Sequence, residues 1–242
     1  MPVAPGVLAL VGGDEFNPGN EQQDRLLAKT AGSGPAYVVP TAAARQGPER
    51  AVAHAQEWFR QFGVELEELP VLKRADANSK DVAALARGGG FFYLVGGDPG
   101  LVVQVLHSSR VWNAITEAWH GGAALAGSSA GAMALCSHTL IRASWPNRFN
   151  RRPTDALGLV ADTAVLPHFE TFGHRWVESA EQALPEATLL GIDERSAAVW
   201  HDAKWHAMGP GVVTVIKAGK SRSFESGKQI AGLRAPARIL SE

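Results

Sequence analysis

The sequence predicts an α/β fold with a mostly parallel central sheet and helices on both faces. Short apolar runs end in glycine, such as residues 7–11 before Gly12 and Gly13, and parallel strands buried on both faces have this character. Such runs alternate with helical segments at the spacing of βαβ units. A length of 242 residues with 45% hydrophobic content suffices for one core. We therefore expect a single domain over residues 1–242.

The first half of the chain supplies the elements of this sheet in order. The predicted strands are 7–11, 36–40 and 91–95, and the predicted helices are 20–29, 49–62 and 80–86. Ser79 precedes the last of these helices and is expected to cap it. Ligands of parallel sheets collect beyond the carboxyl ends of the strands. The stretches to search there are Gly12-Gly13-Asp14, Thr41-Ala42 and Gly96-Gly97-Asp98.

A strand at 122–126 and a helix start at 132–136 flank Gly127-Ser128-Ser129-Ala130-Gly131, which fits the pattern G-x-S-x-G. In this pattern the glycines permit a sharp corner, so the central Ser129 projects its hydroxyl from the sheet. The helix start directs free backbone N–H groups, beginning with Ala130, toward an oxyanion beside Ser129. The same residues are also compatible with a helix that merely packs closely on a strand.

The second half is less regular. Residues 138–156 mix arginines with aromatic residues and prolines without a clean period, which predicts a long loop. Such a loop could recognise an acidic group on a substrate, be solvated, or form a subunit contact. A strand at 163–169 and a helix at 174–183 follow. Short segments at 188–194, 197–201, 205–208 and 212–216 predict an antiparallel meander that closes one edge of the sheet.

Composition argues against several classes of protein. The formal net charge is −1 and charges are mixed, so no nucleic-acid partner is expected. Cys136 is the only cysteine, which excludes an internal disulfide. His168, Glu170 and His174 match no zinc spacing, and no phosphate-binding glycine motif occurs, so we expect neither metal nor cofactor. The N-terminal segment lacks a positive region before its apolar run, so neither a signal peptide nor a membrane span is expected, and the predicted location is cytoplasmic.

A serine nucleophile needs a base within hydrogen-bond reach and a group that orients the base. Of the eight histidines, His168 stands where a strand ends, and side chains at this position meet the ligand crevice of a parallel sheet. Another apolar strand ends in Asp193 and Glu194, either of which could face the imidazole. The alternative is an ordinary turn, where Asp is common.

Four motifs occur in order along the chain: Gly96-Gly97-Asp98, Gly127-Ser128-Ser129-Ala130-Gly131-Ala132, Pro167-His168-Phe169 and Gly191-Ile192-Asp193-Glu194. Together they resemble the signature set of the serine peptidases that include peptidase E (aspartyl dipeptidase) and cyanophycinase. The resemblance implies a flavodoxin-like fold similar to class I glutamine amidotransferases. It also implies a triad of Ser129, His168 and Glu194, with an oxyanion hole formed by backbone N–H groups of Gly96, Gly97 and Ala130.

The resemblance further implies hydrolysis of short peptides, as by a dipeptidase or exopeptidase. Asp98, Arg148 and Arg175 are candidate substrate-binding residues, and the arginines that could anchor a carboxylate are Arg142, Arg148, Arg151, Arg152 and Arg175. Peptidase E typically has tryptophan at the position of Ser128. Cyanophycinases usually have a substrate-binding glutamine where this chain has Pro99.

Three alternatives stay open. A cyanophycinase-like enzyme would cleave β-aspartyl peptides. An esterase of the α/β-hydrolase type would use the same corner, with Asp162 or Asp193 and then His201 or His206. A non-enzymatic binding protein could retain an amidotransferase-like fold. A homodimer is also an open possibility.

Overall fold

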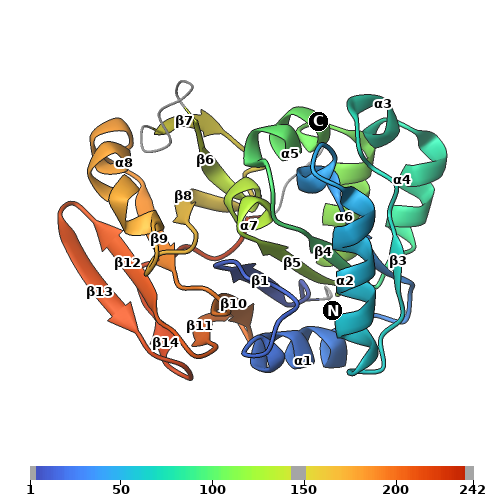
Figure 1. Ribbon diagram of the computed structural model, residues 1–242, viewed down its shortest axis with the longest axis horizontal. Helices are drawn as coiled ribbons and strands as arrows, with labels where there is room; N and C mark the ends of the chain where they lie inside the picture. Colours follow the sequence, from blue (N-terminus) through green and yellow to red (C-terminus); the bar gives the residue numbers. More distant parts are fainter. Residues whose placement is uncertain (1–3, 143–150, 238–242) are drawn as a thin grey trace.

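The computed structural model describes residues 4–142 and 151–237 and arranges their strands in two sheets (Figure 1). The larger sheet has the order β14 (Gln229–Ile230), β11 (Lys204–Met208), β10 (Ala197–His201), β1 (Leu8–Val11), β5 (Ala124–Ser128), β4 (Phe91–Leu94), β2 (Ala36–Val39) and β3 (Leu66–Glu68). The five strands from β1 to β3 in this order are parallel. β10, β11 and β14 extend the sheet with antiparallel pairing. The α/β fold class is confirmed.

The second sheet lies on the left of Figure 1. Its order is β13 (Lys220–Phe224), β12 (Val213–Lys217), β9 (Thr188–Ile192), β8 (Val160–Leu166), β6 (Cys136–Arg142) and β7 (Arg151–Asp155). β6, β8 and β9 are parallel, and the other pairs are antiparallel. The chain enters this sheet directly after the helix α7 (Ala130–Leu135), so the predicted nucleophile corner stands at the junction of the two sheets.

Helices cover both faces of the larger sheet. Alternate strand residues enter different cores, as the two-residue period of a strand requires: Val38 packs in the core that contains Phe59, whereas Val39 packs in the core that contains Trp112. One face carries α1 (Glu21–Thr30) and α2 (Pro48–Arg60). The other carries α3 (Arg74–Ala77), α4 (Lys80–Arg87), α5 (Pro99–Leu106) and α6 (Arg110–His120). The remaining helical elements are η1 (Thr41–Ala43), η2 (Gly173–Trp176) and α8 (Val177–Ala183).

The elements predicted for the first half of the chain agree closely with this arrangement. The predicted strands 7–11, 36–40 and 91–95 correspond to β1, β2 and β4, and the predicted helices correspond to α1, α2 and α4. Ser79 caps α4, because its hydroxyl oxygen accepts a hydrogen bond from the Val82 N–H at 3.4 Å. Among the described residues no helix is long and apolar enough to cross a membrane.

The prediction of an irregular loop over 138–156 is wrong for the part that the structure describes. β6 and β7 form an antiparallel hairpin that runs from the pair His138↔Asp155 to the pair Arg142↔Arg151. β7 is an edge strand that includes Pro153, and its residues are exposed or half-buried. An edge strand of this kind needs no apolar period and tolerates proline, which explains why the pattern did not reveal it. Trp145 and Arg148 lie outside the described residues.

Most of the predicted C-terminal meander is antiparallel, but its first strand, β9, pairs in parallel with β8, and the strands are divided between the two sheets. β12 and β13 join β9 in the second sheet, whereas β10, β11 and β14 extend the larger one. The chain therefore crosses from one sheet to the other between Ile192 and Ala197. Short strands of similar composition do not specify their partners, because pairing depends on contacts far apart in sequence.

A buried carboxyl links the two helices on one face. Asp24 of α1 is fully buried and accepts a hydrogen bond from Trp58 Nε1 of α2 at 2.8 Å. Burial raises the pKa of Asp24 from its ordinary value of 3.8 to about 8. Because the folded-state pKa lies above the unfolded-state pKa, the folded protein retains a proton that the unfolded chain releases. This contribution to stability is complete below pH 4 and is lost as the pH rises to about 8.

We therefore expect Asp24→Asn to change the pH dependence of stability. Asparagine keeps an acceptor for Trp58 but cannot ionise. Between pH 5 and 8 the free energy of unfolding of the wild type should fall relative to that of the variant by up to about 1.4 kcal/mol per pH unit. Urea denaturation of both proteins across this range measures the difference. A difference that does not change with pH would contradict the assignment.

Candidate active site

The predicted nucleophile corner is a strained turn between β5 and α7. Ser129 has φ 46° and ψ −107°, which is unfavourable for a residue with a side chain. A Cβ atom on Gly127 would lie 2.6 Å from the carbonyl carbon of Gly131, and one on Gly131 would lie 2.4 Å from the Leu94 oxygen. Both glycines are thus required by close backbone contacts, which a helix packed closely on a strand would also need. The strained backbone of Ser129 is the observation that favours the nucleophile corner.

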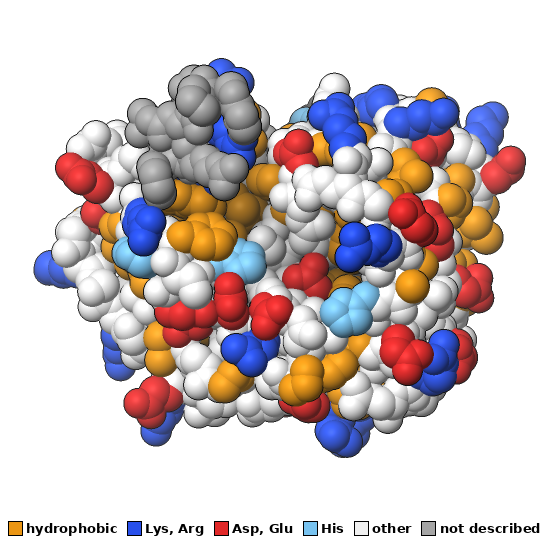
Figure 2. All heavy atoms as spheres, in the orientation of Figure 1, with side chains coloured by type: hydrophobic (Ala, Val, Ile, Leu, Met, Phe, Trp, Pro, Cys, Tyr) orange, Lys and Arg blue, Asp and Glu red, His pale blue; other side chains and the backbone are white. Residues whose placement is uncertain are grey.

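Ser129, His168 and Glu194 form one hydrogen-bonded line. Ser129 Oγ lies 3.1 Å from His168 Nε2, and His168 Nδ1 lies 2.7 Å from Glu194 Oε1. Since a carboxylate only accepts, Nδ1 carries the proton and Nε2 is free to accept from the Ser129 hydroxyl. His168 and Glu194 are partly shielded, with side-chain exposures of 20% and 25%. On the face of the molecule that Figure 2 shows, acidic side chains gather beside a histidine side chain near the middle.

These three residues come from both sheets. Ser129 follows β5 of the larger sheet, whereas His168 follows β8 and Glu194 follows β9, both in the second sheet. His168 stands at the end of a parallel strand, as expected, but this strand belongs to the second sheet. The carboxyl ends of parallel strands in both sheets meet at this point, so the general rule for ligand sites in parallel sheets still applies.

The His168 ring is held on two sides. A Cβ atom on Gly13 would lie 2.3 Å from its Cε1 atom, so only glycine fits there. Phe172 stacks on the ring at a centroid distance of 4.9 Å and an interplanar angle of 22°. The backbone N–H of His168 donates to the Gly12 oxygen at 2.7 Å. The orientation of the imidazole is thus fixed before a substrate binds.

Of the two adjacent carboxylates, only Glu194 contacts the imidazole. Asp193 Oδ2 accepts from the Val212 N–H at 2.9 Å, so it serves the turn before β12. Burial, together with the negative charge of nearby Glu170, raises the pKa of Asp193. The Glu194 backbone N–H donates to the Glu170 carboxylate at 3.0 Å.

The predicted oxyanion donors are only partly available. The Gly96 N–H donates to Glu15 Oε1 at 2.7 Å, so it is not free to bind an oxyanion, contrary to expectation. Gly97 and Ala130 have backbone N–H groups with no acceptor among the described residues. Gly97 has φ 140°, and a Cβ atom there would lie 2.3 Å from the Ala42 oxygen. Glu15, which accepts this hydrogen bond, belongs to no local motif, so the sequence did not indicate it as a site residue.

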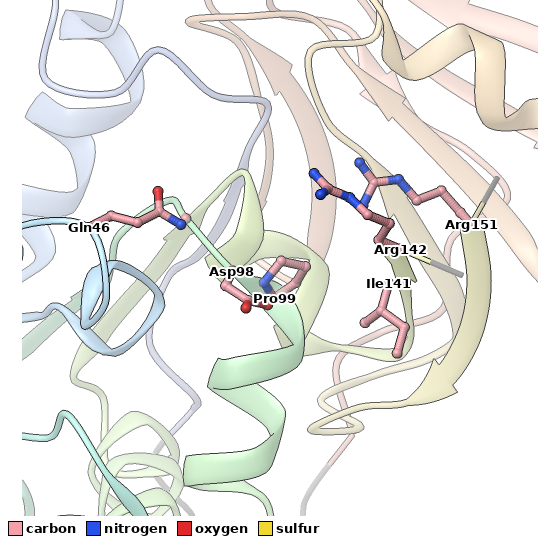
Figure 3. Close-up of a pocket in the computed structure, with 7 residues that line it drawn as sticks. Gln46, Asp98, Pro99, Ile141, Arg142 and Arg151 are labelled. Carbon is pink, nitrogen blue, oxygen red and sulfur yellow. The ribbon is translucent and has the colours of Figure 1, made fainter. Parts of the chain in front are cut away.

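A cavity of about 390 Å³ adjoins this site and is lined by Gln46, Gly97, Asp98, Pro99, Ile141, Arg142 and Arg151 (Figure 3). In this view Arg142 and Arg151 of the hairpin face Gln46 and Asp98 across the opening. Asp98 also caps α5, because its carboxylate accepts from the Leu101 N–H at 3.2 Å.

Arg151 is the best-defined cation of this cavity. Its guanidinium lies 4.1 Å from the centroid of the Trp176 ring, and its buried Nε atom has no hydrogen-bond partner among the residues that the structure describes. Burial and the adjacent charge of Arg142 lower its pKa. No carboxylate of the described chain lies within ion-pair distance of Arg151. The candidate Arg175 is exposed on η2 and does not line the cavity, and the candidate Arg148 lies outside the described residues.

The geometry disfavours the α/β-hydrolase alternative. His201 of β10 lies beside Asp202 near the start of β1, at the opposite end of the sheet from Ser129. His206 lies on β11, which β10 separates from β1. An α/β-hydrolase arrangement would require such a histidine at the serine. Within 4–142 and 151–237, no group of three or more His, Cys, Asp or Glu side chains could hold a metal ion.

A serine in a strained strand–turn–helix corner, hydrogen-bonded in line to an imidazole and a carboxylate, is the arrangement of a serine hydrolase. The pattern of peptidase family S51 matches residues 8–208, so the chain belongs to this family and is a serine-type peptidase. Cyanophycinases from Synechococcus elongatus and Thermosynechococcus vestitus (strain NIES-2133 / IAM M-273 / BP-1) are each 28% identical over 219 residues, covering 87% of this chain and 68% of theirs.

Solved structures agree with this family. A peptidase from an acI-B1 Actinobacterium superposes with a TM-score of 0.82 at 30% identity, covering 95% of this chain and 98% of that one. A peptidase E protein from Listeria monocytogenes EGD-e has a TM-score of 0.63 at 20% identity, covering 86% of this chain and 100% of that one. The second likeness supports the fold alone.

The two carboxylates provide a matched pair of variants. We expect Glu194→Gln to lower kcat/KM by roughly two to four orders of magnitude, because an amide cannot stabilise the imidazolium. Asp193→Asn keeps an acceptor for Val212 and should change kcat/KM by less than about threefold. Steady-state kinetics with the best peptide substrate measures both. The reverse order of effects would show that Asp193 is the orienting acid.

Proposed function

We propose that this serine peptidase hydrolyses short peptides through an acyl-enzyme on Ser129, with His168 as the base and Glu194 as the orienting acid. The observation that carries the proposal is the unbroken line of hydrogen bonds, 3.1 Å from Ser129 Oγ to His168 Nε2 and 2.7 Å from His168 Nδ1 to Glu194 Oε1. These distances lie within the range for proton transfer between a nucleophile and its base.

The chemistry follows from these contacts. Ser129 Oγ attacks the peptide carbonyl while His168 Nε2 takes its proton, and Glu194 stabilises the resulting imidazolium. The tetrahedral oxyanion lies between the backbone N–H groups of Gly97 and Ala130. His168 then protonates the leaving amine, whose departure leaves an ester on Ser129. Water, deprotonated by His168, hydrolyses that ester and restores the enzyme.

The adjoining cavity supplies the proposed substrate-binding region. A volume of about 390 Å³ is at the small end of ligand sites, which favours one or two residues of a short peptide. Guanidinium groups bind carboxylates in a bidentate geometry. We therefore assign Arg151, with Arg142 beside it, to a substrate carboxylate, while Asp98 and Gln46 border the opposite wall.

Cyanophycinase-like cleavage of β-aspartyl peptides is a second candidate, favoured by the two cyanophycinases that match most of this chain.

Two further expectations, on cellular location and on oligomeric state, also stay proposals. A cytoplasmic location agrees with the single, buried Cys136, and a homodimer is open to measurement by light scattering.

A digest of a peptide library tests the function. The wild type should release products from short peptides, with the cleaved bond and its flanking residues identified by mass spectrometry. Ser129→Ala should release none above background, because it removes the attacking oxygen and leaves the backbone of the corner in place. A β-aspartyl-arginine peptide in the same library tests the second candidate. Undiminished cleavage by Ser129→Ala would refute the assignment of the nucleophile.

Neighbouring arginines of β7 provide a test of the carboxylate site. Arg151→Gln should raise KM at least tenfold for a peptide that carries the recognised carboxylate, and far less for the matching amide. Arg152→Gln makes the same charge change on the other face of the strand and should leave both values near wild type. Arg175→Gln in the same assay tests the candidate from the sequence. Equal losses for acid and amide substrates would contradict the role of Arg151.

A further inference from the structure

Glu15 lies outside every motif that identified the site, yet its carboxylate joins two parts of it. Glu15 Oε1 accepts from the Gly96 N–H at 2.7 Å, and Glu15 Oε2 accepts from the Ser128 hydroxyl at 2.8 Å. The residue belongs to the loop between β1 and α1, and its partners are 81 and 113 residues away in sequence. One side chain thus spans the loop after β4 and the end of β5.

These two segments carry the two proposed oxyanion donors. Gly97 directly follows Gly96, and Ala130 follows Ser128 by two residues. An oxyanion hole works only when both donors lie about 2.7–3.1 Å from the developing charge. The separation of the two segments therefore decides whether the hole can form.

The sheet does not set this separation by itself. The ladder between β4 and β5 ends at the pair Leu94↔Gly127. Beyond that pair, no backbone hydrogen bond joins the two segments within the described part of the chain. The Glu15 carboxylate provides the connection that continues past the end of the ladder.

The fold holds Glu15 closely in this position. A Cβ atom on Gly96 would lie 2.9 Å from Glu15 Oε1, so the carboxylate packs directly on this glycine. The next residue, Phe16, has φ 60° and is buried against Tyr93 at a centroid distance of 4.8 Å. Ser128 is fully buried, so its hydroxyl needs the partner that Glu15 provides.

We propose that Glu15 is a positioning residue that sets the distance between the two halves of the oxyanion hole. The role rests on the proposed function of Ser129. Glu15 touches neither the substrate nor the reacting atoms, and it acts through Gly96 on one side and Ser128 on the other. The carboxylate geometry suits this task, because its two oxygens accept from two donors at once.

The test compares Glu15→Gln and Glu15→Ala with Glu21→Gln. Glu21 offers a matched control, since its carboxylate accepts from the Gly19 N–H at 2.7 Å in the same region, and among the described residues it has no hydrogen bond or ion pair to a site residue. Glu15→Gln keeps an acceptor for the Gly96 N–H but presents an amide N–H to Ser128, whose buried hydroxyl then loses its acceptor. This variant should lower kcat about tenfold or more. Glu15→Ala removes both contacts and should lower kcat by about 10²–10³, the loss typical of an impaired oxyanion hole. KM should stay within about threefold of wild type, and Glu21→Gln should behave as wild type.

A second measurement separates positioning from general destabilisation. The rate at which a fluorophosphonate probe modifies Ser129 should fall in step with kcat, because the phosphonyl oxygen uses the same donors. Folding is checked by thermal unfolding, and Glu15→Gln decides the question if Glu15→Ala does not fold. Values of kcat and of the modification rate within threefold of wild type for Glu15→Gln, or a change confined to KM, would overturn the proposal. Failure of the wild type to react at Ser129 would instead refute the proposed function.

Discussion

The loop that follows β1 is the constraint on which the site depends, because it bonds to both sheets at once. The Gly12 N–H donates to the Ser196 oxygen at 2.9 Å, and the Gly12 oxygen accepts from the His168 N–H at 2.7 Å. The Gly13 oxygen accepts from the Arg195 N–H at 2.9 Å. A Cβ atom on Gly12 would lie 2.1 Å from the Asp193 oxygen, so the approach is possible only for glycine. These backbone bonds help to fix the nucleophile of one sheet relative to the base of the other.

Four non-glycine residues around this loop have a positive φ. Asp14, Ser129, His168 and Arg195 have φ values of 53°, 46°, 48° and 58°. Such conformations are unfavourable for residues with side chains and persist only where surrounding packing imposes them. Here the imposing structure is the pair of buried cores on either side of the larger sheet. The fold therefore stabilises a site geometry that its local sequence would not adopt alone.

What the sequence could predict depended on how local each feature is. The strand–turn–helix corner at Ser129 was predictable because its glycines and serine lie within five consecutive residues. Assignment of His168 and Glu194 needed the ordered motifs as well, since the spacing of strand ends left Asp193 as an equal candidate. The structure separates these two carboxylates by their hydrogen-bond partners, His168 for Glu194 and Val212 for Asp193.

Other features were not predictable because they depend on distant contacts. Three features are of this kind: the division of the C-terminal strands between two sheets, the edge hairpin of β6 and β7, and the bridge formed by Glu15. Each joins segments whose local sequence patterns do not indicate which distant segment they contact. Gly96 illustrates the consequence. The family resemblance made it an expected oxyanion donor, yet its N–H donates to Glu15, 81 positions earlier in the sequence.

The central claim is that Ser129 is the nucleophile of a triad assembled from two sheets. Its most direct test is to treat the protein with a fluorophosphonate and locate the adduct by peptide mapping and mass spectrometry, in the wild type and in His168→Ala. The account predicts one adduct, on Ser129, formed orders of magnitude more slowly in His168→Ala. An adduct on Ser128 or another residue, or one on Ser129 that forms equally fast without His168, would contradict it.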